Sequence, residues 1–261
     1  MIDRAFSRLY NFDFEGTQII LQQYVKDHSS DPLGYAVRSA ACLFSELHRL
    51  MILESEFLGD DRRINEKKKL KPDPEVKREL FQAVEEAQKL ALEKLAVNPK
   101  DPDALFSLSM TAGVLADYTA LIEKRQLGSL WYARQSHGYA RRLLQIDPAF
   151  YDAYLTIGFN EYLIGSLPFF VRWFARFEQV QGSKQQAIRN LEIVAQSGKY
   201  LKAFAKILLA IIHLREKRPQ ETERLLAELS REYPENPLIR KELGKISARL
   251  RSRESPAVQK R

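Results

Sequence analysis

Short turns that contain proline divide this chain, and they constrain its fold more than any other feature. They occur at Ser30-Asp31-Pro32, Asn98-Pro99, Asp147-Pro148 and Tyr233-Pro234, each between two amphipathic stretches. Proline ends a helix because it lacks the amide hydrogen and restricts the residue before it. Glycine and proline number only 11 each in 261 residues, so other breakers are sparse. The sequence therefore predicts an all-α fold of long helices joined by short turns.

The residues that follow three of these prolines share a pattern: a large residue, an apolar residue and a small residue at offsets six, nine and ten. The small residue would let a partner helix approach closely. The matching residues are Leu105, Leu108 and Ser109, then Tyr154, Ile157 and Gly158, then Arg240, Leu243 and Gly244. The most complete unit covers residues 203–236, with helices predicted over 203–216 and 220–233 and a turn at 217–219.

This pattern resembles the tetratricopeptide repeat, in which two antiparallel helices form each unit and proline closes the second helix. The resemblance implies a right-handed α-solenoid of antiparallel helix hairpins, with about ten to twelve helices in a single domain over residues 1–250. Lys94 and Leu143 depart from it, because the family usually has alanine there. The alternative is a generic bundle of helices that end at prolines.

Three further segments resemble a branch of bacterial tetratricopeptide-repeat proteins of uncharacterised function. They begin at Ile2-Asp3, Tyr151-Asp152-Ala153 and Lys184. The likeness implies a scaffold and supplies no activity. Members of that branch often carry an export signal, so a periplasmic or exported location is an alternative to the cytoplasmic one that this chain suggests.

The cytoplasmic expectation rests on the composition and on the absence of a signal at the start of this chain. Hydrophobic residues make up 45% and charged residues 29%, which is ordinary for a soluble protein. Cys42 is the only cysteine, so no intrachain disulfide can form. The most apolar run, 203–214, is shorter than the roughly 20 residues that span a bilayer, so no transmembrane segment is predicted.

The net charge of +7 is concentrated at the C-terminal end. Residues 240–261 contain eight Lys/Arg and two Glu, which gives +6 and leaves +1 for the first 239 residues. Residues 251–261 are therefore predicted to form a basic, disordered tail, with nucleic-acid or adaptor binding through this tail as the alternative function. Residues 59–74 are predicted to be a charged, solvated loop, or alternatively a docking loop centred on Lys67, Lys68, Lys69 and Lys71.

Signatures of catalysis, cofactor binding and metal binding are missing from the sequence. The histidines at 28, 48, 137 and 213 form no zinc motif, and no phosphate-binding or dinucleotide-binding glycine pattern occurs. Glu46 and His48 are two residues apart on a helix, so they would point in different directions. The sequence predicts no enzyme activity, no cofactor and no metal.

The predicted function is to bind a protein or peptide partner in the concave groove of the solenoid. The repeat phase projects five side chains onto that groove, namely Phe106, Met110, Leu155, Phe159 and Tyr162. The aromatic segment 167–177, with Phe169 and Trp173, adds two candidates. This segment would form core, bind a partner or meet a membrane surface, and core packing is the commonest use of so apolar a helix in a solenoid.

Overall fold

The structure, a computed structural model, describes residues 1–53, 71–166 and 184–254. These ranges contain eleven α-helices and one π-helix, and no strand occurs in them. The all-α fold predicted from the proline turns is therefore confirmed. Most of the charged loop predicted at 59–74, the aromatic segment 167–177 with Phe169 and Trp173, and residues 255–261 of the predicted tail lie outside the described residues.

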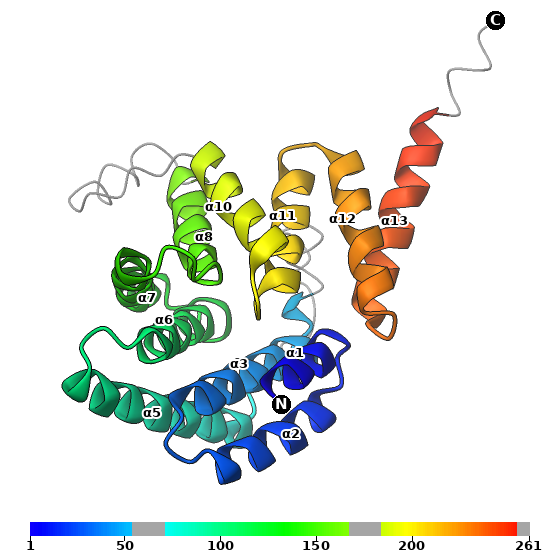
Figure 1. The fold of residues 1–261 in the computed structure, drawn as a ribbon. Helices are drawn as coiled ribbons and strands as arrows, with labels where there is room; N and C mark the ends of the chain where they lie inside the picture. The colour runs from blue at the N-terminus through cyan, green and yellow to red at the C-terminus, as the bar shows by residue number, and fades with distance from the viewer. Residues whose placement is uncertain (54–70, 167–183, 255–261) are drawn as a thin grey trace, which may run out of the picture.

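The helices follow one another as antiparallel pairs, each packed against the next pair along the chain (Figure 1). We call the first helix of a pair the leading helix and the second the trailing helix. The pairs are α1 (Ile2–Tyr10) with α2 (Phe14–Asp27), α3 (Pro32–Arg49) with α5 (Pro74–Val97), α6 (Pro102–Asp117) with α7 (Gln126–Ile146), α8 (Ala153–Ser166) with α10 (Lys184–Ser197), and α11 (Lys202–Arg215) with α12 (Pro219–Glu232). The last helix, α13 (Pro237–Glu254), packs on α12.

Several helices start at an Asp-Pro or Asn-Pro pair. The Asp31, Asp101 and Asn236 side chains each accept a hydrogen bond from a backbone amide in the first turn, as at Asp101 Oδ1, 2.8 Å from the Ala104 amide. The proline that follows loses nothing, because the first helical amides have no partner within the helix. The helices predicted over 203–216 and 220–233 are confirmed, with bounds one residue earlier in α11 and α12.

The turns from leading to trailing helices repeat one geometry. A residue in the left-handed region follows each of four leading helices, two positions after α1, α3 and α11 and seven positions after α6, with φ between 59° and 64°. These residues are Phe12, Met51, Lys124 and Lys217. After Phe12 and Lys217 the next amide reaches back five residues to a helical carbonyl, at 3.0 Å from Asp13 to Arg8 and 2.8 Å from Arg218 to His213. This is the usual way to satisfy carbonyls at a helix end.

The turns from trailing to leading helices repeat a second geometry, and they coincide with the proline turns found in the sequence. The residue after the trailing helix has φ between −127° and −135°, and its carbonyl accepts from the amide three positions later. The residue pairs are His28 with Asp31, Asn98 with Asp101, Asp147 with Phe150, and Tyr233 with Asn236, at 3.0 to 3.2 Å. The same turn thus follows α2, α5, α7 and α12.

The close approach predicted for small residues is confirmed at one position and wrong at another. A β-carbon on Gly158 would lie 2.8 Å from the Ala187 carbonyl oxygen, so α8 and α10 can pack this closely only with glycine there. A β-carbon on Gly244 would meet nothing within 4 Å. In the described residues α13 has no trailing helix, so nothing approaches Gly244.

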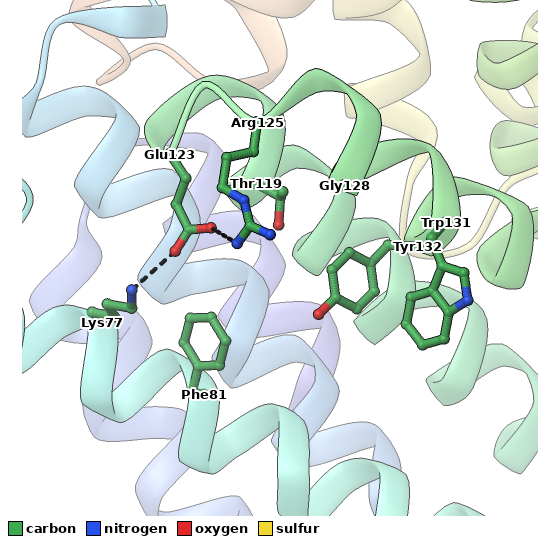
Figure 2. Close-up of a pocket in the computed structure, with 8 residues that line it drawn as sticks. All are labelled: Lys77, Phe81, Thr119, Glu123, Arg125, Gly128, Trp131 and Tyr132. Carbon is green, nitrogen blue, oxygen red and sulfur yellow. Dashed lines mark hydrogen bonds and ion pairs between the residues drawn. The ribbon is translucent and has the colours of Figure 1, made fainter.

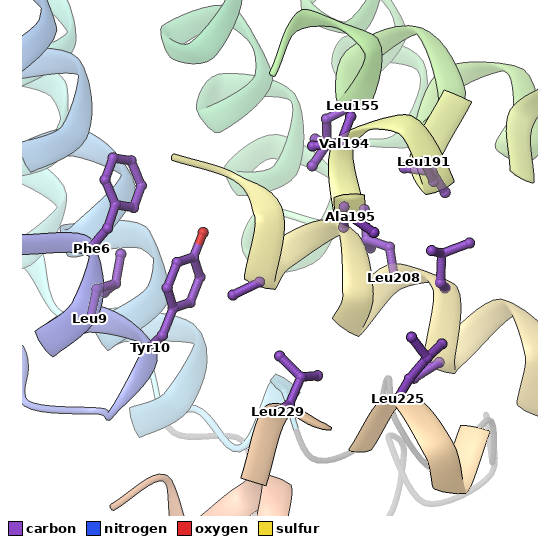
Figure 3. Close-up of a cluster of buried hydrophobic side chains, with 14 of the residues drawn as sticks. Phe6, Leu9, Tyr10, Leu155, Leu191, Val194, Ala195, Leu208, Leu225 and Leu229 are labelled. Atoms are coloured by element: carbon purple, nitrogen blue, oxygen red, sulfur yellow. The ribbon is translucent and has the colours of Figure 1, made fainter. Parts of the chain in front are cut away.

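The beginning of the chain packs against its C-terminal third. The Tyr10 hydroxyl donates to the Tyr200 carbonyl at 3.1 Å, and the Asn236 side-chain amide donates to the Tyr10 carbonyl at 2.7 Å. Figure 3 shows Phe6, Leu9 and Tyr10 on one side of this core, with side chains of α10, α11 and α12 on the other. Phe44 of α3 also meets Phe204 of α11 edge to face. Helices α1 and α3 therefore contact the C-terminal third of the chain.

A buried carboxylate joins two of the pairs. Asp152, just before α8, accepts hydrogen bonds from the backbone amides of Lys199, Tyr200 and Leu201 at 2.8 to 3.2 Å. A β-carbon on Gly198 would lie 2.9 Å from Asp152 Oδ1 and 2.7 Å from the Val194 carbonyl oxygen. The turn before α11 therefore fits only glycine at 198, and Asp152 holds that turn against the start of α8.

One described helical stretch, Pro102–Ile122, is long and apolar enough to cross a membrane by length and composition. The protein buries 67% of it, and core helices of soluble proteins pass the same test. The absence of a transmembrane segment therefore stays a prediction.

Candidate functional site

The five groove residues predicted from the repeat phase lie together in the main hydrophobic core. Phe106, Leu155 and Tyr162 are 3%, 8% and 5% exposed, while Met110 and Phe159 are half-buried and pack against the same cluster. Their role in binding a partner stays a prediction, because in this conformation they serve the protein's own packing.

Aromatic contacts cover Phe106, one of these five side chains. The Tyr200 ring lies 5.5 Å from the Phe6 ring and 6.1 Å from the Phe106 ring, measured between centroids. Phe106 also contacts Phe150 at 4.9 Å. Tyr200, in the turn before α11, therefore covers Phe106 and is itself contacted by Phe6 of α1.

A hollow of about 350 Å³ opens elsewhere, between α5, α7 and the turn that joins α6 to α7. Figure 2 shows Lys77 and Phe81 of α5 on one side and Trp131 and Tyr132 of α7 on the other. We call this hollow the α5–α7 pocket. Its remaining lining residues are Thr119, Glu123, Arg125 and Gly128.

The leading helix beside this pocket ends differently from the others. After α6 the chain makes one π-helical turn, η1 (Tyr118–Ile122), in which the Glu123 amide reaches back five residues to the Tyr118 carbonyl at 3.1 Å. The Arg125 amide reaches back six residues to Thr119, one more than Arg218 does in the equivalent turn. One extra residue is thus accommodated here, and single π turns are frequent at functional sites.

Three charged side chains form a chain along the rim of the pocket. Glu123 accepts from Lys77 Nζ at 2.9 Å and from Arg125 Nη1 at 3.5 Å. The Lys77 ammonium also lies 5.5 Å from the centroids of both the Phe81 and Tyr118 rings. The hydrogen bond to Glu123 raises the pKa of Lys77, so this side chain stays charged. The rim therefore carries two positive charges against one negative charge.

The start of α7 also exposes large apolar side chains. Leu127, Leu130 and Trp131 are 85%, 49% and 56% exposed, and their spacing places them on one helix face. We call these three residues the exposed row. Trp131 belongs to both the row and the pocket, where its ring meets Tyr132 edge to face.

The surroundings of the row are basic. Residues 124–146 contain five Lys/Arg and no Asp or Glu. The contributing residues are Lys124, Arg125, Arg134, Arg141 and Arg142. Among the residues that line the pocket, Glu123 is the acidic one.

Glu46, His48 and Cys42 lie apart from this pocket and are held by contacts within the fold. Glu46 binds Arg49 and the Asp73 amide, while His48 packs against Phe12 and Phe14, so the two point apart as predicted. Burial raises the pKa of Cys42 to about 11, which keeps the thiol protonated at neutral pH. No group of three or more His, Cys, Asp or Glu side chains in these ranges is placed to hold a metal ion.

Sequence reasoning missed the α5–α7 pocket. A signal was present, since Trp131 stands four residues after Leu127 in a stretch without acidic residues. The π turn and the meeting of Lys77 with Glu123, 46 residues apart, gave no such signal. Comparison of the chain with protein families, with curated proteins and with solved structures found no match.

Proposed function

We propose that this protein is a scaffold of the tetratricopeptide type that binds another protein at the α5–α7 pocket and the exposed row. The observation that carries the proposal is the exposure of Trp131, Leu127 and Leu130 beside a hollow. Large apolar side chains gathered next to a cavity are typical of protein-binding surfaces. Tryptophan and arginine are also the residues that most often dominate binding energy.

The repeated turn geometry supports the repeat type. A left-handed residue occurs in four of the turns that follow leading helices, and one hydrogen-bonded turn recurs after α2, α5, α7 and α12. Repeats built from helix pairs commonly serve as interaction surfaces. That step is an analogy between folds, so the binding proposal itself rests on the surface of α7.

The proposed site differs from the concave groove predicted from the sequence. The groove residues are packed against the chain's own aromatic rings, whereas Trp131 is more than half exposed. A partner can reach the α7 surface without any rearrangement of the core.

Site-specific photo-crosslinking tests the proposal. A photoreactive amino acid at Leu130 should crosslink to a partner protein in cells of the source organism. The same group at Leu92, an exposed leucine of α5 with 53% exposure against 49% for Leu130, is the matched control. The Leu130 crosslink should disappear when Gly128→Leu fills the pocket. Equal crosslinking from positions 92 and 130, or none from position 130, would contradict a binding site on α7.

A further inference from the structure

We propose that the α5–α7 pocket takes one bulky apolar side chain from a partner segment whose neighbouring residues are acidic. This inference rests on the proposed function and names the chemistry of the segment that binds. It combines the size of the pocket, the aromatic rings that line it and the charges on its rim.

The size and lining of the pocket fit a single anchoring side chain. Its volume of about 350 Å³ is at the lower end of the range for ligand pockets. Phe81, Trp131 and Tyr132 contribute ring surfaces, and Gly128 leaves the wall between them open. A buried apolar anchor surrounded by a polar rim is the usual arrangement of a binding hot spot.

The rim has hydrogen-bond donors to spare for a carboxylate. Lysine carries three N–H donors and arginine carries five. Lys77 gives one hydrogen bond to Glu123, and Arg125 gives one longer hydrogen bond to it. Glu123 holds the two cations near each other, while the side chains of Lys77 and Arg125 remain 46% and 71% exposed. An acidic residue beside the anchor would therefore meet two neighbouring positive charges at the end of the pocket mouth opposite Trp131.

The same geometry disfavours a nucleic acid or a lipid surface. A phosphodiester backbone would meet Lys77 and Arg125 but carries no bulky apolar side chain to fill the hollow. A lipid surface would contact only the protruding row and would leave the hollow unfilled. An acidic protein segment uses the hollow, the rim and the acid-free surface of α7 together.

The test uses labelled synthetic peptides and the full-length protein. The probe peptides carry one Phe, Leu or Trp flanked on both sides by glutamates, and binding is measured by fluorescence polarisation. Matched peptides replace the anchor by Ala, or the glutamates by Gln or Lys. We expect each replacement to weaken binding by about tenfold or more, the loss expected for one anchoring contact or charge pair.

Two variants separate the anchor from the charges. Gly128→Leu should abolish binding of every anchor peptide, because the new side chain fills the hollow. Its β-carbon would lie 3.4 Å from Thr119 Cγ2, an ordinary contact, so the helix has room for it. Arg125→Glu should weaken binding of the glutamate peptides and strengthen binding of the lysine peptides. Trp131→Ala, at a 56% exposed position, gives a second anchor variant, and Ile19→Ala, at a 60% exposed position of α2, is the control that should bind like the wild type.

Three results would overturn the inference. The first is no binding of any glutamate peptide up to about 1 mM, which is the limit of weak specific recognition. The second is equal binding by the Arg125→Glu protein. The third is binding of phosphatidylglycerol vesicles or of single-stranded oligonucleotides that Gly128→Leu abolishes while peptides fail. If the Leu130 crosslink to a partner persists in any of these cases, the proposed function stands and only the acidic chemistry is wrong.

Discussion

Single buried side chains set how this fold responds to pH, and Tyr10 is the clearest example. The tyrosine is 7% exposed, and its hydroxyl donates to the Tyr200 carbonyl. Burial, together with Tyr233 and Asp152, raises the pKa of Tyr10 well above its ordinary value of 10.0. Since the folded state disfavours the phenolate, Tyr10 stabilises the protein below about pH 10, and this contribution is lost as the pH rises above the pKa of the unfolded chain.

The variant Tyr10→Phe should therefore show opposite effects at neutral and alkaline pH. At pH 7.5 the loss of one buried hydrogen bond should lower the free energy of unfolding by about 1 kcal/mol. Above pH 10 the free energy of unfolding of the wild type should fall relative to that of the variant, by up to about 1.4 kcal/mol per pH unit. The reason is that only the wild type must keep a buried hydroxyl protonated at position 10. Urea unfolding at pH 7.5 and pH 11 measures the difference. A difference between the two proteins that stays constant across these pH values would show that Tyr10 ionises freely in the folded state.

At the scale of the helices, much of the structure could be predicted from the sequence. Asp31, Asp101 and Asn236 with their prolines define helix starts by local hydrogen bonds, so short-range chemistry is enough. The π turn could not be predicted in this way. It depends on one extra residue between α6 and α7, and nothing in Tyr118–Ile122 distinguishes that residue from an ordinary helical one.

Because η1 accommodates an extra residue, the protein should tolerate deletion of one residue from η1. Deletion of Ala120 should convert η1 into an α-helical turn and lower the free energy of unfolding by less than about 2 kcal/mol. Deletion of Ala112, buried at 1% exposure within regular α6, should rotate every following side chain by about 100° and unfold the domain. Thermal unfolding monitored by circular dichroism compares the two. Equal damage from both deletions would show that the π turn is not a separable insertion.

At the scale of the whole molecule, the sequence was least informative. The resemblance to tetratricopeptide repeats predicted an open groove. In the structure, hydrogen bonds join Tyr10 to Tyr200 and to Asn236. These partners are 190 and 226 residues apart, and no local pattern predicts which distant segments meet. Phe106 and Leu155 were predicted to line the groove and are buried in the core, and what covers them could not be read from their spacing.

The contact between α1 and the start of α13 can be tested at Asn236 without disturbing the cap that this residue forms on α13. Its side-chain oxygen accepts from the Leu238 and Ile239 amides, and its NH₂ group donates to Tyr10. In Asn236→Asp the carboxylate keeps the cap but faces the Tyr10 carbonyl without a hydrogen to donate. We expect a loss of about 1–3 kcal/mol and faster amide exchange in α1, with α13 unchanged.

The control is Asp101→Asn, which alters an equivalent cap that does not bind α1. Hydrogen exchange read by mass spectrometry reports on α1 and α13 separately. Faster exchange in α13 alone, or no change in α1, would mean that Asn236 acts only as a cap.

The two kinds of turn described for the fold also differ in how much length they allow. From trailing to leading helix the connections have four residues at 28–31, 98–101, 198–201 and 233–236, and six residues at 147–152. From leading to trailing helix the described connections have three residues at 11–13 and at 216–218, and eight residues at 118–125, π turn included. Connection length therefore varies more from leading to trailing helix than in the reverse direction. A foreign peptide grafted at Lys217 should be tolerated and displayed, which makes the α11–α12 turn the natural place to install a tag or a new recognition loop.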